Sequence, residues 1–186
     1  MRKILIIAAF AATLMSCAPR AKHTEMPPAV AEALSSLPGS DGKESLYYAL
    51  VELGKGNRAL LVTSGVYDDL EGHMASIEAS VFSFTEDGTI SDCGCVRSQG
   101  TSYPLAVRNG ELYVAGHRFI DRCSLDEDVS GLIETGSLLE VLDSLGEPLY
   151  YVLDKDMVCV PGDSLVEAAF NEWSRAEVIS FIPVGK

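Results

Sequence analysis

The segment YDDLEGHM gathers residue types that often bind metals or transfer protons. Asp68, Asp69, Glu71 and His73 all lie between positions 68 and 73. Carboxylates and an imidazole can coordinate a divalent cation, and a paired aspartate and histidine can act as the acid and base of a hydrolase. These carboxylates are too few and too closely spaced for a self-contained oxygen cage, and Gly72 among polar residues is typical of a surface loop. We therefore expect a polar loop that holds no structural metal.

Two further groups of titratable residues have simpler interpretations. Asp126, Glu127 and Asp128, in SLDEDVSG, predict a solvated turn rather than a cation site. His117, in AGHRFI, predicts a strand residue at a bend rather than a functional imidazole. The sequence also contains no nucleophile elbow, phosphate-binding loop, HExxH or dinucleotide fingerprint. We therefore expect no cofactor, and a non-catalytic protein is favoured.

The start of the chain has the features of an export signal. Met1, Arg2 and Lys3 carry positive charge, and an apolar segment over 4–14 follows. That segment is too short to cross a bilayer, since a spanning helix needs about 20 apolar residues. An ordinary secretory signal, in which Cys17 has no special role, is one interpretation.

The stretch Leu14, Met15, Ser16, Cys17 resembles the lipobox of bacterial lipoproteins. The resemblance implies that the Cys17 thiol carries a diacylglycerol thioether and that cleavage before Cys17 makes it the acylated N-terminus. Two or more acyl chains anchor a protein stably to a membrane, whereas one does not. Ala18 after the cysteine resembles lipoproteins sent to an outer membrane. We expect an extracytoplasmic, lipid-anchored protein of the cell membrane or the outer membrane, with the outer membrane preferred.

The charge of the chain restricts its partners. Residues 17–186 retain 12 basic and 27 acidic residues, a net charge of −15. Nucleic acids and anionic lipid surfaces both require a basic protein surface, so we expect neither to bind. The membrane contact predicted here comes from lipid on Cys17, and the acidity is explained by solubility.

The remaining sequence predicts one β-rich domain. Residues 1–16 form the signal peptide, residues 17–44 a proline-containing tether with a possible short helix over 28–37, and residues 45–186 a single globular domain. Glycine-containing turns at 54–57, 87–88 and 109–110 separate apolar strands, and a two-residue loop at 109–110 places Arg108 opposite Glu111 and Val107 opposite Leu112. The segment SLLEVLDSLGE, over 137–147, has the apolar spacing of a helix, but its glycine between strand-like flanks favours a hairpin. Ser164 and Glu167 have the spacing of a capping box and predict a helix near the C-terminus. We expect an α+β fold: an antiparallel meander of about eight strands with this helix packed on the sheet.

Four cysteines remain once Cys17 is assigned to lipid: Cys93, Cys95, Cys123 and Cys159. Their even number in an exported domain predicts disulfides. Cys93 and Cys95 lie too far apart along a regular strand for a direct bond. We therefore expect two bridges that join this pair to Cys123 and Cys159, with the individual pairing open.

The Asp87–Gly88 turn predicts the register around these cysteines. A two-residue loop there places Phe84 opposite Ser91, Phe82 opposite Cys93 and Ser80 opposite Cys95. Cys93 and Cys95 would then share a face with Phe82 and Phe84. Four reduced cysteines packed as small hydrophobes, or a zinc or thiol-redox site, remain alternatives.

The segment over Tyr47–Val62, YYALVELGKGNRALLV, resembles exported bacterial lipoproteins that contain an aspartate-rich DLDGDG loop before a strand ending ELLV. Here Glu52, Gly54 and Gly56 are retained, but Lys55 replaces part of the acidic ladder that a calcium loop needs. The resemblance therefore implies an exported lipoprotein domain and no calcium site.

Three function classes follow from these patterns. A lipid-anchored, non-catalytic binding or envelope-accessory module of unknown ligand ranks first. A hydrolase using Asp68, Asp69 and His73 ranks second, and a cysteine-based redox or metal module on Cys93 and Cys95 ranks third.

Overall fold

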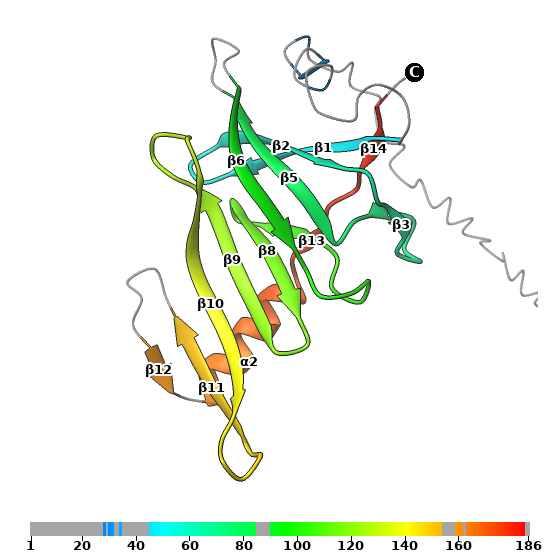
Figure 1. The fold of residues 1–186 in the computed structure, drawn as a ribbon. Helices are drawn as coiled ribbons and strands as arrows, with labels where there is room; N and C mark the ends of the chain where they lie inside the picture. The colour runs from blue at the N-terminus through cyan, green and yellow to red at the C-terminus, as the bar shows by residue number, and fades with distance from the viewer. Residues whose placement is uncertain are drawn as a thin grey trace, which may run out of the picture.

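The computed structural model describes residues 45–84, 90–153, 159–161 and 163–184, together with Pro28, Val30, Ala31 and Leu34 (Figure 1). The prediction of a sheet-dominated, antiparallel fold is confirmed. Its strands form a five-stranded, a seven-stranded and a two-stranded sheet, and all the strand pairs are antiparallel. The predicted single meander of about eight strands differs from this arrangement, because short strands and a division between two larger sheets leave little local trace.

The five-stranded sheet has the strand order β14-β1-β2-β5-β6. Its first hairpin joins β1 to β2 with Leu53 opposite Asn57, so the predicted turn of glycines between them is confirmed. The C-terminal strand β14 returns to pair with β1 at the edge. The strands of this sheet are β1 (Tyr47–Leu53), β2 (Asn57–Thr63), β5 (Glu78–Phe84), β6 (Ile90–Arg97) and β14 (Ile182–Pro183).

The seven-stranded sheet has the order β12-β11-β10-β9-β8-β7-β13, so six consecutive strands form a meander. Helix α2 (Asp163–Trp173) follows β12, which confirms the C-terminal helix. The hairpin predicted around Gly146 is also confirmed, with Leu142 opposite Pro148. The strands are β7 (Ala106–Arg108), β8 (Glu111–Gly116), β9 (Phe119–Leu125), β10 (Leu132–Leu142), β11 (Pro148–Leu153), β12 (Cys159–Pro161) and β13 (Glu177–Val178).

The turn between β7 and β8 shows why the local pattern predicted this hairpin correctly. Asn109 and Gly110 have φ angles of 51° and 77°, values that asparagine and glycine adopt most readily. Arg108 therefore pairs with Glu111 and Val107 with Leu112, as the sequence predicted.

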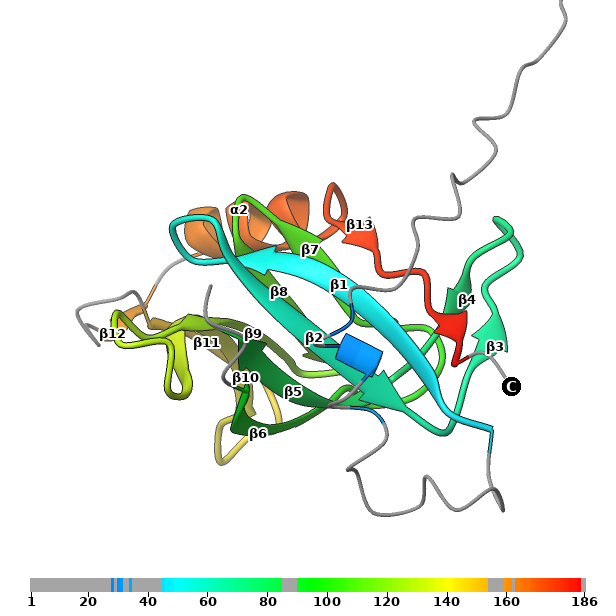
Figure 2. The same ribbon diagram turned by 90° about the horizontal axis from the view of Figure 1, so that it is seen from above.

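The main core lies between the two larger sheets, and Figure 2 shows β1 and β2 crossing in front of β8. Alternating apolar residues on one face of each sheet meet there, as expected for stacked sheets. The buried members from the five-stranded sheet include Leu61 and Val81, and those from the seven-stranded sheet include Leu112 and Val114. We call this cluster the central core.

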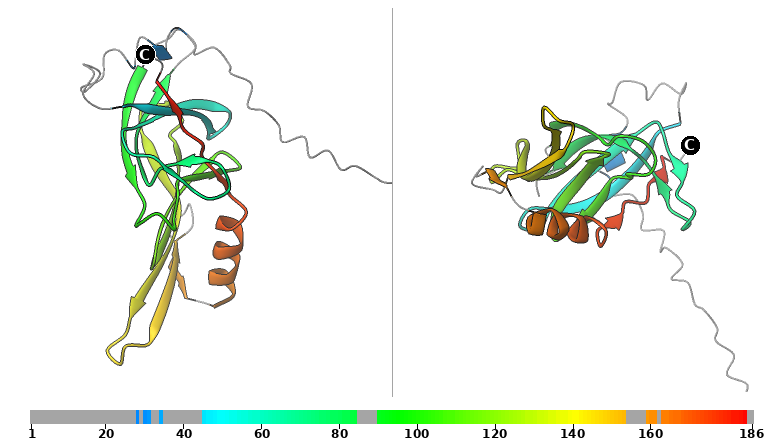
Figure 3. Two further views of the ribbon diagram at one scale, coloured as in Figure 1. Left: turned by 90° about the vertical axis from the view of Figure 1, so that its right-hand side faces the viewer. Right: turned by 90° about the horizontal axis from the view of Figure 1, so that it is seen from below.

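Each larger sheet also has an outer apolar cluster. Val30 and Leu34, which are helical, are buried with Tyr48, Leu60 and other residues of the five-stranded sheet. Val166, Ala169 and Trp173 of α2 pack against a cluster on the outer face of the seven-stranded sheet, formed by Ala106, Tyr113, Ala115, Ile120 and Leu138. Figure 3 shows α2 along that face. Helical segments therefore contact both outer faces.

Two hydrogen bonds to turn carbonyls join the larger sheets. The Gly54 N–H of the β1–β2 turn donates to the Gly110 carbonyl of the β7–β8 turn over 2.7 Å. The hydroxyl of Ser83 in β5 donates to the carbonyl of Val129, in the turn that precedes β10. These contacts fix the sheets relative to each other at the edge of the central core.

Several predictions fall outside the described residues. These are the signal peptide and lipobox with Cys17, most of the tether, the Asp87–Gly88 turn, and the side chains of Cys159 and Ser164. They remain predictions.

Candidate functional site

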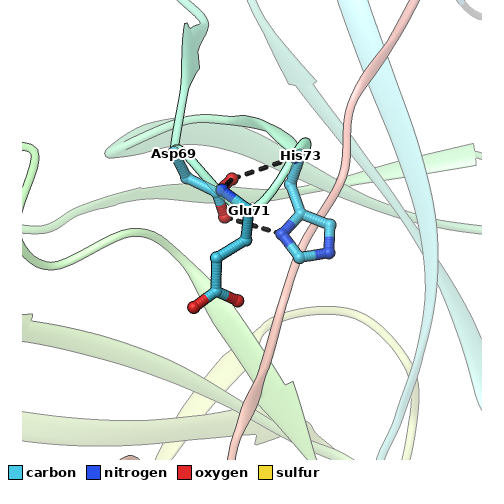
Figure 4. Close-up of side chains that lie close together, drawn as sticks. All are labelled: Asp69, Glu71 and His73. Atoms are coloured by element: carbon cyan, nitrogen blue, oxygen red, sulfur yellow. Dashed lines mark hydrogen bonds and ion pairs between the residues drawn. The ribbon is translucent and has the colours of Figure 1, made fainter.

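The predicted acidic loop is the tip of a small hairpin inserted between β2 and β5. The hairpin consists of β3 (Tyr67–Asp68) and β4 (Met74–Ala75). It holds Asp69, Glu71 and His73 together, and their possible ligand atoms all lie within 4.8 Å of one another (Figure 4). The sequence placed these residues in one loop but did not predict this convergence.

Asp69 organises the loop through both of its carboxylate oxygens. Oδ1 accepts hydrogen bonds from the backbone N–H groups of Glu71 and His73, each over 2.9 Å. Oδ2 lies 2.6 Å from Nδ1 of His73. Desolvation would raise the pKa of Asp69, but these hydrogen bonds from His73 and Glu71 outweigh it and hold the pKa below its ordinary value. Asp69 is therefore a carboxylate at neutral pH.

The contact between Asp69 and His73 has two possible chemical uses. A carboxylate on Nδ1 orients an imidazole so that Nε2 can accept a proton, which is the arrangement of a general base. With Glu71, the same groups supply three ligands for a divalent cation, fewer than a closed site requires. The loop itself contains no serine, threonine or cysteine that could act as nucleophile.

The same aspartate-to-backbone hydrogen bonds occur in the β10–β11 hairpin, whose turn has no histidine. Asp143 Oδ1 accepts hydrogen bonds from the backbone N–H groups of Leu145 and Glu147, over 2.7 and 2.9 Å. These donors follow the aspartate by two and four residues, as the donors to Asp69 do. Both turns have the sequence pattern D-x-x-G-x, and Gly72 and Gly146 have φ angles of 94° and 84°. The hydrogen bonds of Asp69 thus have a structural explanation that does not depend on a metal or a substrate.

The cysteines of β6 lie in a different register from the predicted one. Ser80 does pair with Cys95, but Phe82 pairs with Asp92 instead of Cys93, and Phe84 pairs with Ile90 instead of Ser91. The register shifts between Ser80 and Phe82. Gly94 has a φ angle of 100° there, so its β-bulge inserts the extra residue.

The bulge turns the two thiols to opposite faces of the sheet. Cys93 packs against the central core, together with Val81. Cys95 pairs with Ser80, whose neighbours Ala79 and Val81 face that core, so Ser80 and Cys95 face the other way. Cys95 therefore lies on the face of Phe82 and Phe84, as predicted, whereas the prediction that Cys93 shares this face is wrong.

The third described cysteine, Cys123 in β9, lies in a site that disfavours its thiolate. Burial, followed by the charges of Asp121, Glu134 and Glu111, raises the pKa of Cys123 to about 11. A thiol with this pKa reacts slowly with electrophiles. Cys93, Cys95 and Cys123 are free thiols in the structure, and the predicted bridges to Cys123 and Cys159 remain a prediction.

The other two candidate groups lie in exposed turns. Asp126 closes the β9–β10 turn by accepting hydrogen bonds from the N–H and hydroxyl of Ser130, over 2.6 and 2.8 Å. Glu127 approaches Lys55 at 3.8 Å, but both side chains are almost fully exposed, so this pair adds little stability. His117 lies in the turn between β8 and β9.

The sequence did not predict a charged cluster beneath α2. Arg122 lies 3.4 Å from Glu111 and 3.6 Å from Glu172 of the helix. Arg122 and Glu172, with apolar side chains such as Leu138, line a cavity of about 190 Å³. Ligand sites usually exceed about 300 Å³, so the cavity is small for a drug-sized ligand. The contact of Arg122 with Glu111 depends on the β8–β9 register, in which Arg122 pairs with Tyr113, and local patterns do not specify that register.

Comparison with models of known protein families, with curated proteins and with solved structures gave no match. Among the described residues, no helix has both the length and the apolar character needed to span a membrane.

Proposed function

We propose that this chain is an exported lipoprotein in which lipid on Cys17 anchors a non-catalytic binding module to the cell envelope. The observation that carries the proposal is the sequence of Leu14, Met15, Ser16 and Cys17 after a basic start and a short apolar segment. Thioether lipid and N-terminal acylation at Cys17 would together provide stable anchoring. Ala18 favours the outer membrane.

Labelling with a fatty-acid analogue tests the anchor. Cells that express the whole chain should incorporate the label, and the Cys17→Ser variant should not. Cys95→Ser is the matched control, because it removes an exposed cysteine elsewhere in the chain and should leave labelling unchanged. Label on Cys17→Ser would contradict the proposal.

Binding rather than catalysis is supported by how the candidate groups are used. Asp69 accepts two backbone hydrogen bonds in the same positions as Asp143, which fixes a turn without any histidine. Among the described residues, three cavities of about 190, 310 and 570 Å³ are lined by residues other than those of the β3–β4 tip.

A hydrolase is the second candidate, and the 2.6 Å contact between Asp69 and His73 favours it. Hydrolysis of a chromogenic ester by the whole chain tests this function. Activity that is lost in His73→Ala but kept in His117→Ala would support a hydrolase and contradict the non-catalytic proposal. Equal rates for both variants and the unaltered chain would exclude His73 as a base in this reaction.

A further inference from the structure

The seven-stranded sheet extends beyond the sheet that covers its inner face. Figures 1 and 3 show the β10–β11 hairpin projecting away from β1, β2 and β5. Leu139 pairs with Phe119, which packs against the central core, so Leu139 lies on the same face as that core. Val141 shares this face by alternation, and Leu149 shares it as the partner of Val141.

These three side chains are exposed although they lie on a core-facing surface. Leu139, Val141 and Leu149 are 43%, 40% and 45% exposed. We call them the uncovered strip. Scattered exposed leucines are ordinary, whereas adjacent apolar residues on one flat face are typical of an interaction site.

The charged residues of β10, β11 and the turn between them have one sign. Residues 132–153 contain four acidic residues and no basic residue. Glu134 lies on the face of the strip, since it pairs with Cys123, while Asp143 and Glu147 lie at the hairpin tip. Glu140 is approached by Arg118 at 3.9 Å, from the β8–β9 turn. An apolar surface with an acidic border is complementary to an apolar surface with a basic border.

The opposite face of the same strands shows that an apolar face of this sheet can pack against a helix. There, Leu138 of β10 and Val152 of β11 pack with Val166, Ala169 and Trp173 of α2. An amphipathic helix thus covers one face of β10 and β11, while no helix among the described residues covers the other face at the uncovered strip.

We propose that the uncovered strip binds a cationic amphipathic helix of a partner protein. This inference rests on the proposed role as a binding module, and it does not depend on lipidation. The carboxylates of Asp143 and Glu147 at the hairpin tip oppose insertion into an anionic membrane. The net charge of −13 opposes close association with a second copy of the chain.

The test measures binding of a synthetic helical peptide to the whole chain in phosphatidylcholine nanodiscs. The peptide has about 14 residues, with leucines at helical spacing and lysines elsewhere, and a scrambled peptide of equal composition is its control. Fluorescence anisotropy gives both dissociation constants, with empty nanodiscs subtracted. We expect the scrambled peptide to bind at least about tenfold more weakly, because it has the charge without the apolar face.

Variants of the chain locate the binding surface. Replacing both Val141 and Leu149 with serine should weaken peptide binding by about tenfold or more. Leu70→Ser, at a leucine that is 97% exposed on a different hairpin, is the matched control and should bind as the unaltered chain does. Glu134→Gln should weaken peptide binding by about threefold and reduce the salt dependence of binding. This variant provides a second test if the double serine variant is destabilised.

Four results would overturn the proposal. The first is equal affinity for the two peptides, and the second is unchanged affinity after the Val141 and Leu149 replacements. The third is a dimer, seen in sedimentation, that these replacements dissociate. The fourth is binding to phosphatidylglycerol vesicles that depends on the uncovered strip, without binding of the peptide. Each is distinct from failure of the Cys17 labelling experiment, because acylation does not enter the peptide measurement.

Discussion

Leu112 and Leu139 lie on the same face of the seven-stranded sheet, yet their surroundings differ completely. Leu112 in β8 is fully buried in the central core, whereas Leu139 in β10 is 43% exposed. Both strands have the alternating pattern that produces an apolar face. The pattern therefore specifies which face is apolar, and the neighbouring sheet decides how much of that face is covered.

This difference divides the apolar face of the sheet into a covered region and an exposed region. Around β8 and β9, the second sheet removes the apolar face from water and provides the hydrophobic stabilisation. Around the β10–β11 hairpin, the same kind of face is partly exposed, and we propose that a partner binds there. Substitutions in the two regions should consequently affect different properties, namely stability in the first and binding in the second.

The largest expected difference is between alanine substitutions at the two leucines. Leu112→Ala should reduce the free energy of unfolding by about 2–5 kcal/mol, because it leaves a cavity in a packed core. Leu139→Ala should cost less than about 1 kcal/mol, since much of the side chain is already in water. Urea unfolding measures both values. Equal losses would show that the β10–β11 hairpin is as well covered as the central core.

A smaller difference is expected between two turn glycines. Gly110 and Gly146 have φ angles of 77° and 84°, so alanine is strained at either position by about 1 kcal/mol or more. A Cβ at Gly110 would also lie 2.6 Å from the Gly54 carbonyl oxygen, whereas a Cβ at Gly146 meets nothing within 4 Å. Gly110→Ala should therefore lower the melting temperature further than Gly146→Ala. If the two variants melt together, the contact between the β1–β2 and β7–β8 turns does not join the sheets.

The sequence predicted structure well where the signal was local. Asn109 with Gly110 predicted the turn and the pairing of Val107 with Leu112, and the glycine near 146 predicted the β10–β11 hairpin. The β5–β6 register failed next to the turn, because Phe84 pairs with Ile90 and a two-residue loop at 87–88 does not allow that pairing. The bulge at Gly94 then restores the predicted pairing of Ser80 with Cys95. Division into two stacked sheets was also missed, since it depends on contacts between strands distant in the chain.

The candidate site shows the same limit. Residue types predicted a polar loop at Asp68 to His73, but the 2.6 Å contact between Asp69 and His73 depends on turn geometry. The uncovered strip was missed for the opposite reason. Leu139, Val141 and Leu149 have the alternation of ordinary core residues, and their exposure follows only from the extent of the other sheet.

The pH dependence of stability should reveal opposite environments for two aspartates. Desolvation raises the pKa of Asp121 in β9, although the Ser137 hydroxyl donates to it, while the hydrogen bonds from Ser130 lower the pKa of Asp126. A raised folded-state pKa means that stability falls as the pH rises through the interval above the ordinary value of 3.8. A lowered pKa means that stability rises with pH through the interval below that value.

Asparagine variants measure how each aspartate makes stability depend on pH. Relative to the unaltered chain, the melting temperature of Asp121→Asn should improve as the pH rises from the ordinary pKa of an aspartate. Asp126→Asn is the matched control, and its relative melting temperature should worsen with pH over the more acidic interval. If the relative melting temperatures of both variants changed with pH in the same direction, Asp121 would be as well solvated as a turn residue.

The smallest expected effect is that of metal removal at the β3–β4 tip. Asp69 and Asp143 fix their turns with the same pair of backbone N–H donors, so neither turn requires a cation for its shape. The cluster of Asp69, Glu71 and His73 offers three ligands, whereas calcium takes about six to eight oxygens. A chelator should therefore leave the melting temperature of the whole chain within about one degree. A drop of several degrees that is absent in Glu71→Gln would instead assign a stabilising metal to this tip, and the parallel with Asp143 would then be structural coincidence.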